Sequence, residues 1–180
     1  MIFTETKLKG AFIIDLERFE DSRGFFAHSW SAAEFAHRDL DSELVECSIS
    51  VNNRKGTLRG MHYQAHPHGQ TKLVRCTMGA IYDVVIDLRV SSPTFKQWIG
   101  VELSANNHRM LYVPKDFAHG FQTLEDNSEV FYQMSYHYVP ESGRGVRWDD
   151  PAFSIHWPSA NRIIIERDRE YQDFNENTFV

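Results

Sequence analysis

The hydrophobic positions of this chain cluster in short runs that are rich in β-branched and aromatic residues, which is typical of β-strands. Strands are predicted at residues 73–76, 81–88, 98–103, 110–113 and 130–139. Turn-forming residues separate these runs, for example at 78–80, 91–93, 105–107 and 114–116. Short strands with almost no helix between them predict an all-β sandwich or barrel with antiparallel pairing.

One helix is predicted before the strands begin. Ser31 and Glu34 have the spacing of a capping box, in which the serine side chain accepts a hydrogen bond from the backbone three residues on. The helix is expected to continue through residues 35–37.

The predicted strand at 130–139 alternates in a way that bears on function. Tyr132 and Tyr138 fall on one face, and at ~3.3 Å per residue they would lie roughly 20 Å apart. The spacing would suit a long ligand with one tyrosine at each end. Buried tyrosines also fill protein cores with their hydroxyls hydrogen-bonded, and the pattern alone favours that interpretation.

Length and composition describe one folded domain. The chain has 180 residues, and we expect residues 1–180 to form a single domain. Apolar residues make up 42% of the chain and aromatic residues 13%, so disorder is not expected. The formal charge of −6 speaks against binding to nucleic acid or to a membrane, since both need a basic surface. A few local arginines or lysines would still suffice to bind a phosphate group.

No signal for export or membrane insertion is apparent. Residues 1–5 lack the basic start and apolar run of a signal peptide, and no stretch approaches the length of a membrane span. Cys47 and Cys76 are too few for a disulfide framework. We therefore expect a cytoplasmic protein.

The histidines raise the question of a metal site. His62, His66, His68 and His119 are similar to the ligands of cupin barrels, which usually add a carboxylate a few residues after a spaced histidine pair. Here the residues after His68 include Lys72 and no carboxylate, and a cation opposes metal binding. We expect neither a metal nor another cofactor.

Basic residues offer a second kind of site. Arg23, Arg59, Lys72 and Arg75 lie near glycines or strand ends, and each by itself could be a solvated surface charge. Pointing inward together, they would bind an anion. The sequence has no dinucleotide fingerprint, no P-loop and no serine or cysteine nucleophile motif.

Several separated motifs, in register, carry a resemblance to a known family. They are Arg23-Gly24-Phe25-Phe26, Leu58-Arg59-Gly60-Met61-His62-Tyr63-Gln64, Lys72-Leu73-Val74-Arg75-Cys76, Ser92-Pro93-Thr94-Phe95 with Gln97-Trp98, Phe117-Ala118-His119-Gly120-Phe121, and Trp157-Pro158 leading to Arg167-Asp168. Over nearly its whole length the chain resembles the dTDP-4-dehydrorhamnose 3,5-epimerases. The resemblance implies a double-stranded β-helix, or cupin-like jelly roll, with a few short helices, assembled as a homodimer.

The same resemblance implies a reaction and a set of roles. Family members epimerise the two carbons flanking the C4 ketone of a nucleotide-linked 4-keto-6-deoxyhexose, and in the parent activity the product, dTDP-4-dehydro-L-rhamnose, is a precursor of surface polysaccharides. His62 would be the general base, Asp168 the carboxylate that orients it, and Tyr132 the acid on the opposite face. Six further positions would contact the substrate: Arg23, Arg59, Lys72, His119, Tyr138 and Arg167. Among them, Lys72 would stabilise the enolate, Tyr138 would pack on the nucleotide base, and Arg167 replaces a common lysine.

These roles suit the chemistry. A C–H next to a ketone is acidic only if the enolate charge is stabilised, so a fixed cation should supply the largest effect. A histidine titrates near neutral pH, and a carboxylate beside it fixes its tautomer and is expected to favour its protonated form. Arg59 and His62 are three residues apart, which would point them to opposite faces of an ideal strand, but a bulge or bend at Gly60 could re-aim one of them.

Some positions depart from the family pattern, and other functions stay open. His28 stands where many members have Glu, residues 46–48 stand near a usual Gln and Asn, and 143–145 replace a loop containing Glu. These departures bear on which nucleotide and sugar are bound and on whether both carbons invert. The alternatives are a single-site epimerase or ketoisomerase on a related nucleotide sugar, a metal-dependent cupin oxygenase, and a sugar-nucleotide-binding module without catalysis.

Overall fold

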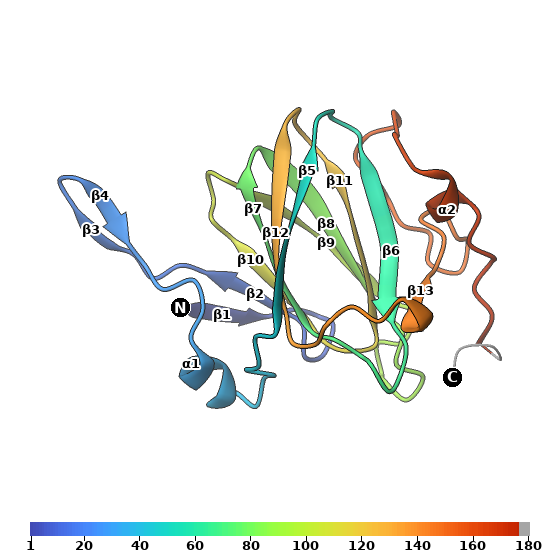
Figure 1. Ribbon diagram of the computed structural model, residues 1–180, viewed down its shortest axis with the longest axis horizontal. Coiled ribbons are helices and arrows are strands. Elements are labelled where there is room, and N and C mark those ends of the chain that lie inside the picture. The colour runs from blue at the N-terminus through green and yellow to red at the C-terminus, as the bar shows by residue number, and fades with distance from the viewer. Residues whose placement is uncertain (177–180) are drawn as a thin grey trace.

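The computed structural model describes residues 1–176 and consists mostly of β-strands (Figure 1). Residues 177–180, which the expected domain includes, lie outside the described residues. The strands are β1 Ile2–Glu5, β2 Phe12–Asp15, β3 Phe19–Asp21, β4 Gly24–Phe26, β5 Glu46–Asn52, β6 Leu58–Gln64, β7 Lys72–Met78, β8 Ala80–Asp87, β9 Trp98–Ser104, β10 Met110–Val113, β11 Phe117–Thr123, β12 Ser128–Met134 and β13 Gly143–Gly145. The helical segments are α1 Ala32–Ala36, the 3₁₀ turn η1 Pro140–Ser142 and α2 Glu166–Arg169. Neither α-helix of the described chain has the length and apolar character needed to span a bilayer.

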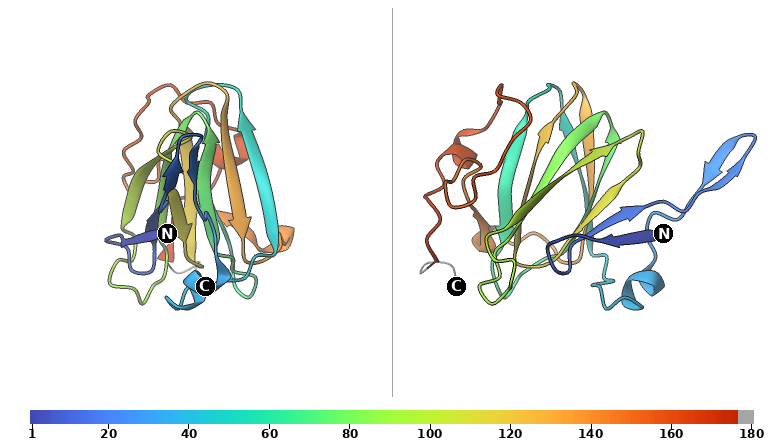
Figure 2. Two further views of the ribbon diagram at one scale, coloured as in Figure 1. Left: turned by 90° about the vertical axis from the view of Figure 1, so that its left-hand side faces the viewer. Right: turned by 180° about the vertical axis from the view of Figure 1, so that it is seen from behind.

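Two antiparallel sheets enclose the core, and they can be followed in Figures 1 and 2. The strand order is β1-β2-β10-β7-β12-β5 in one sheet and β13-β6-β11-β8-β9 in the other, so neighbours in space are mostly not neighbours in sequence. Fully buried residues from both sheets, such as Val74, Val85 and Leu111, share one hydrophobic cluster. The predicted all-β, cupin-like jelly roll is therefore confirmed.

The predicted strands at 73–76, 81–88, 98–103 and 110–113 correspond to β7, β8, β9 and β10, with ends that differ by two residues at most. The predicted strand at 130–139 is wrong in its second half, because β12 ends at Met134. Beyond that point side chains bind the backbone in place of a neighbouring strand. The amide of Gln70 donates to the Tyr136 carbonyl at 2.7 Å, and the Val139 N–H donates to the Gln64 side chain at 2.6 Å.

The predicted helix start is confirmed. The Ser31 hydroxyl accepts the backbone N–H of Glu34 at 3.4 Å, and α1 follows it directly. Phe35, only 1% exposed, anchors this short helix against Tyr112 on the outer side of the six-stranded sheet.

A hairpin formed by β3 and β4 projects away from the barrel (Figures 1 and 2). Its aromatic side chains are unusually exposed, with 61% of Phe19 and 65% of Phe26 accessible. At the tip, the Arg23 guanidinium donates to Asp21 at 2.6 Å and is otherwise in solvent. The hairpin lacks a core of its own within this chain.

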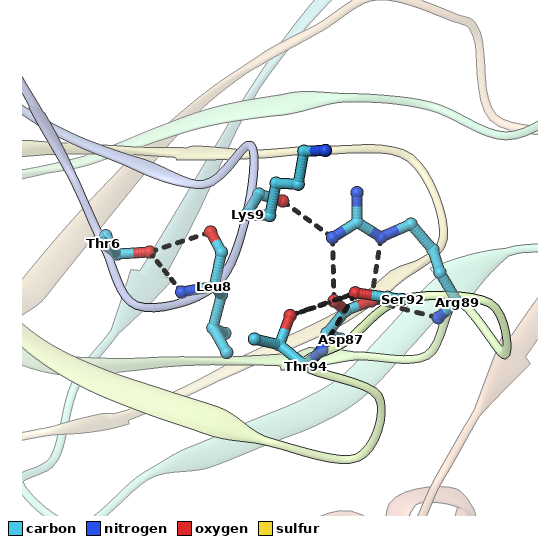
Figure 3. A network of polar contacts seen from close by, with 7 residues as sticks. All are labelled: Thr6, Leu8, Lys9, Asp87, Arg89, Ser92 and Thr94. Atoms are coloured by element: carbon cyan, nitrogen blue, oxygen red, sulfur yellow. Dashed lines mark hydrogen bonds and ion pairs between the residues drawn. The ribbon is translucent and has the colours of Figure 1, made fainter.

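A polar network around the buried Asp87 holds the N-terminal loop onto the barrel at the end of β8 (Figure 3). The Asp87 carboxylate accepts two hydrogen bonds from Arg89, at 2.7 and 2.9 Å, and one each from the hydroxyls of Ser92 and Thr94. Arg89 also donates to the Lys9 carbonyl at 2.7 Å. The motif at 92–95 thus has a structural role, because the hydroxyls of Ser92 and Thr94 donate to the same carboxylate that binds Arg89.

Candidate active site

A distortion of β6 directs two side chains into one cavity. Arg59 and His62 both line a cavity of about 450 Å³, although ideal strand geometry would separate them. The pairing of β6 with β11 shifts register between His119 and Phe121. Gly60 has a backbone φ of 131°, which residues other than glycine rarely adopt. A Cβ on Gly60 would also lie 2.5 Å from the Cα of Gly120. The predicted irregularity at Gly60 is therefore confirmed.

His62 and Asp168 form a hydrogen-bonded pair between β6 and α2. The His62 Nε2 lies 2.8 Å from Asp168 Oδ1, and Asp168 Oδ2 accepts the backbone N–H of Gly60 at 3.1 Å. The carboxylate is completely buried, so both of its oxygens are held in place. An Arg167 nitrogen lies 3.2 Å from the same Nε2. The closer, buried carboxylate is the better partner, so we place the ring proton on Nε2 and leave Nδ1 free to accept one.

The surroundings favour the neutral form of this histidine. Burial lowers the pKa of His62 below its usual value, and the cations Lys72 and Arg167 lower it further, while Asp168 opposes them. We expected the carboxylate to favour the charged form, and burial together with two cations outweighs it. Burial raises the pKa of Asp168, but its bonds from His62, Gly60 and Arg167 hold it below the usual range. A neutral imidazole beside an ionised carboxylate is suited to accept a proton.

Tyr132 and Lys72 lie on paired strands across the cavity from the dyad. Both line a pocket of about 260 Å³ together with His62 and His119. Burial raises the pKa of Tyr132 far above its usual value, so its hydroxyl stays protonated. Burial lowers the pKa of Lys72 to about 8, and the charge of Asp83 opposes that fall. The cavity therefore holds a proton donor and a cation whose charge depends on its surroundings.

His119 leads to a residue that the sequence analysis did not select. Its Nε2 lies 2.7 Å from Oδ1 of Asp83, and both side chains are buried. Asp83 and Asp87 are the two aspartates of β8, whose other buried residues are apolar. A charge in such a run is the signal that could have singled out Asp83.

The remaining expected contacts are divided between the cavity rim and the projecting hairpin. Arg59 is fixed by Asn52, whose side-chain oxygen accepts its Nε–H at 2.8 Å. Tyr138 is 57% exposed and lines the 260 Å³ pocket, although it lies beyond β12. Arg167 lines both the 450 Å³ cavity and an adjoining one of about 600 Å³ that also includes Lys72, Tyr138 and Arg144. Arg23 lines none of these cavities, because the hairpin carries it away from the barrel.

The four histidines that raised the question of a metal do not gather at one point: His62 and His119 line the same cavity, whereas His66 and His68 do not. His68 bonds the hydroxyl of Ser142 at 2.8 Å, and His66 is exposed. Among residues 1–176 no three His, Cys, Asp or Glu side chains form a group that could hold a metal ion. The expectation that neither metal nor cofactor is needed stays a prediction.

A cupin-like jelly roll whose barrel holds a hydrogen-bonded histidine–aspartate pair and a protonated tyrosine has the groups that a small proton-transferring enzyme needs. Comparison with known proteins shows which family within this class the chain belongs to. The sequence model of the dTDP-4-dehydrorhamnose 3,5-epimerases matches residues 5–176, and the chain belongs to that family of isomerases.

Individual relatives agree over almost the whole chain. A dTDP-4-dehydrorhamnose 3,5-epimerase of Methanothermobacter thermautotrophicus is 41% identical, with 97% of this chain and 95% of the relative aligned. The crystal structure of the Elizabethkingia anophelis enzyme of that name superposes with a TM-score of 0.95 at 37% identity, covering 100% of this chain and 99% of the other. The Bacillus anthracis enzyme, crystallised with TDP and PPi bound, gives 0.92 at 40% identity, covering 96% and 99%.

Proposed function

We propose that this protein epimerises dTDP-4-dehydro-6-deoxy-D-glucose at C3 and C5 to give dTDP-4-dehydro-L-rhamnose. The observation that carries the proposal is the His62–Asp168 pair, which faces a cavity shared with Tyr132 and Lys72. Relatives at about 40% identity bear the name of this activity. A binding module would not need a base and an acid in one cavity.

The proposed reaction is two rounds of the same proton transfer. Nδ1 of His62 removes the proton from a carbon beside the C4 ketone, and the C–H electron pair moves to the ketone oxygen as an enolate. The Lys72 ammonium and His119 stabilise that oxygen. Tyr132 then donates its hydroxyl proton to the opposite face of the carbon, which inverts the centre. Solvent exchange returns His62 and Tyr132 to their starting forms.

Substrate positioning is proposed for the basic and aromatic rim. Arg59 and Arg167 would hold the diphosphate, because guanidinium groups bind phosphate oxygens in a bidentate manner. The exposed ring of Tyr138 would pack against the nucleotide base. The TDP bound to the Bacillus anthracis enzyme supports thymine as that base.

We further propose that the functional unit is a homodimer of one-domain chains. The exposed apolar side chains Phe19 and Phe26 on the hairpin, and Ile49 and Val51 on edge strand β5, need a partner surface. A second copy would cover them and would bring the hairpin's Arg23 to the partner's cavity. Sedimentation at low micromolar concentration tests this, and a monomer would refute it. A cytoplasmic location, consistent with two free cysteines, is part of the same proposal.

The activity is tested by incubating the protein with dTDP-4-keto-6-deoxyglucose in heavy water and following C3 and C5 by NMR. The proposal expects deuterium at both carbons and a doubly inverted product. Deuterium and inversion at one carbon only would show a single-site epimerase, and a moved carbonyl would show a ketoisomerase. His62→Ala is the negative control, because exchange at both carbons should stop without the base.

A further inference from the structure

Asp83 is a buried charge that lies outside the cavities. Its side chain is 0% exposed, and it is not among the residues that line the three cavities near His62. One oxygen, Oδ1, is bonded to His119, whereas Oδ2 has no hydrogen-bond partner among the described residues. A buried carboxylate oxygen without a partner costs free energy, so a compensating interaction is expected.

The charged and titratable groups that face Asp83 come from three strands. They are Lys72 and Cys76 of β7, His119 of β11 and Tyr132 of β12. β7 and β12 belong to the six-stranded sheet, while β8 belongs to the other, so the carboxylate acts across the barrel interior. Lys72 forms no salt bridge with any described residue, and Asp83 is the acid among them that raises its pKa.

We propose that Asp83 is a positioning residue for the proton transfer: one oxygen holds His119, and the carboxylate charge keeps the ammonium of Lys72 protonated inside the barrel. The inference rests on the part that the proposed function gives to Lys72. It explains why an acidic residue is buried in the middle of β8 without lining the cavities. It also explains why Oδ2 has no hydrogen-bond partner, because the carboxylate acts on Lys72 by electrostatic attraction rather than by a hydrogen bond.

The sign of the effect follows from Lys72. An amine is active here only when protonated, so activity should fall as the pH rises through its pKa, which is about 8. Replacing Asp83 by asparagine can retain an oxygen for His119 and removes the charge, with the amide nitrogen taking the place of the unpartnered Oδ2. Losing a nearby opposite charge should lower the pKa of Lys72 by about one unit. At pH 8 that shift reduces the protonated fraction of Lys72 roughly fivefold.

The experiment compares Asp83→Asn with Asp87→Asn, which alters the other buried aspartate of the same strand. Asp87 bonds Arg89, Ser92 and Thr94 and does not face Lys72, so its variant reports any general loss of stability. Three quantities are measured for each protein: the pH profile of kcat/KM, the pKa of Lys72 by NMR of ¹³C-labelled lysine, and the affinity for dTDP. Asp83→Asn should lower the Lys72 pKa, move the alkaline limb of the profile to lower pH by the same amount, and leave dTDP affinity unchanged. Asp87→Asn should move neither the pKa nor the limb.

Each other outcome is decisive. An unchanged Lys72 pKa in folded Asp83→Asn overturns the proposal. If the Lys72 pKa falls but the alkaline limb of the profile does not move, the charge of Lys72 does not limit the reaction. That result overturns the positioning role of Asp83. If the wild-type protein has no epimerase activity, the proposed function fails, and the NMR titration still decides whether Asp83 controls Lys72. Should Asp83→Asn not fold, Asp83→Ser replaces it. If neither folds, the wild-type titration decides, because a Lys72 that is uncharged at pH 7 contradicts the proposal.

Discussion

Replacing Asp168 by asparagine separates two effects of this carboxylate on His62. The new side chain can keep an oxygen on the Gly60 N–H, where Oδ2 now accepts at 3.1 Å. Its amide nitrogen would then face Nε2 of His62, which lies 2.8 Å from the present Oδ1. An amide N–H donates, so Nε2 would have to accept and the ring proton would move to Nδ1. The nitrogen that should take the substrate proton would then lack a free lone pair.

The expected loss is large and independent of pH. A misplaced general base costs ~10²–10⁴-fold in rate, and inversion of a histidine tautomer belongs at the upper end. Asp168 raises the pKa of His62, so its removal lowers that pKa further, and the imidazole stays neutral down to a lower pH. If Asp168 acted only by changing the charge of His62, its replacement would therefore leave the rate at pH 8 unchanged, because His62 would be neutral there in both proteins.

Deuterium exchange at C3 and C5, followed by NMR from pH 5 to 9, measures the effect. Asp150→Asn is the matched control, since Asp150 is also buried and accepts the backbone N–H groups of Ala152 and Phe174. Asp168→Asn exchanging at the wild-type rate above pH 7 would refute the orienting role of the carboxylate. That result would mean that Arg167, the other neighbour of Nε2, determines the tautomer of His62.

Further predictions concern the acid, the fold, the metal and the nucleotide. Tyr132→Phe should retain isotope exchange but lose most doubly inverted product, ~10²-fold or more, and product formation at the wild-type rate would make Tyr132 a core residue only. Asp87→Asn should lower stability by about 2 kcal/mol and Tm by about 4–8 °C in thermal unfolding. Bonds from Arg89, Ser92 and Thr94 hold the pKa of Asp87 below its usual value despite burial, so this stabilisation is present above about pH 4 and fades as the pH falls further. Chelation should not reduce activity, and bound transition metal whose removal abolishes activity would contradict this. Specificity constants should show a weaker or different preference for dTDP over CDP and UDP sugars than in the parent family, and an undiminished preference would show that the departures around His28 and Arg144 are neutral.

Local patterns allowed the regular parts of the fold to be predicted, and long-range contacts account for the errors. The runs that became β8 and β10 consist mostly of β-branched and other apolar residues, and the serine cap at α1 needs only three neighbouring residues. The end of β12 depends on side chains that come from 66 to 75 residues away, those of Gln70 and Gln64. Such contacts leave no trace in the alternation of residues 130–139.

In the candidate site, too, long-range contacts determine what local sequence patterns could not predict. The proposed catalytic pair joins residues 106 positions apart, and in the sequence only the family resemblance connects His62 with Asp168. Asp83 matched no motif, because its value depends on His119 and Lys72 facing it from other strands. Geometry also changed the expectation for His62: a carboxylate neighbour alone predicts a raised pKa, whereas burial beside two cations lowers it. The protonation states that the reaction needs are thus properties of the closed barrel rather than of any motif, and a substitution that leaves every motif intact, such as Asp83→Asn, should still shift the pH at which the enzyme works.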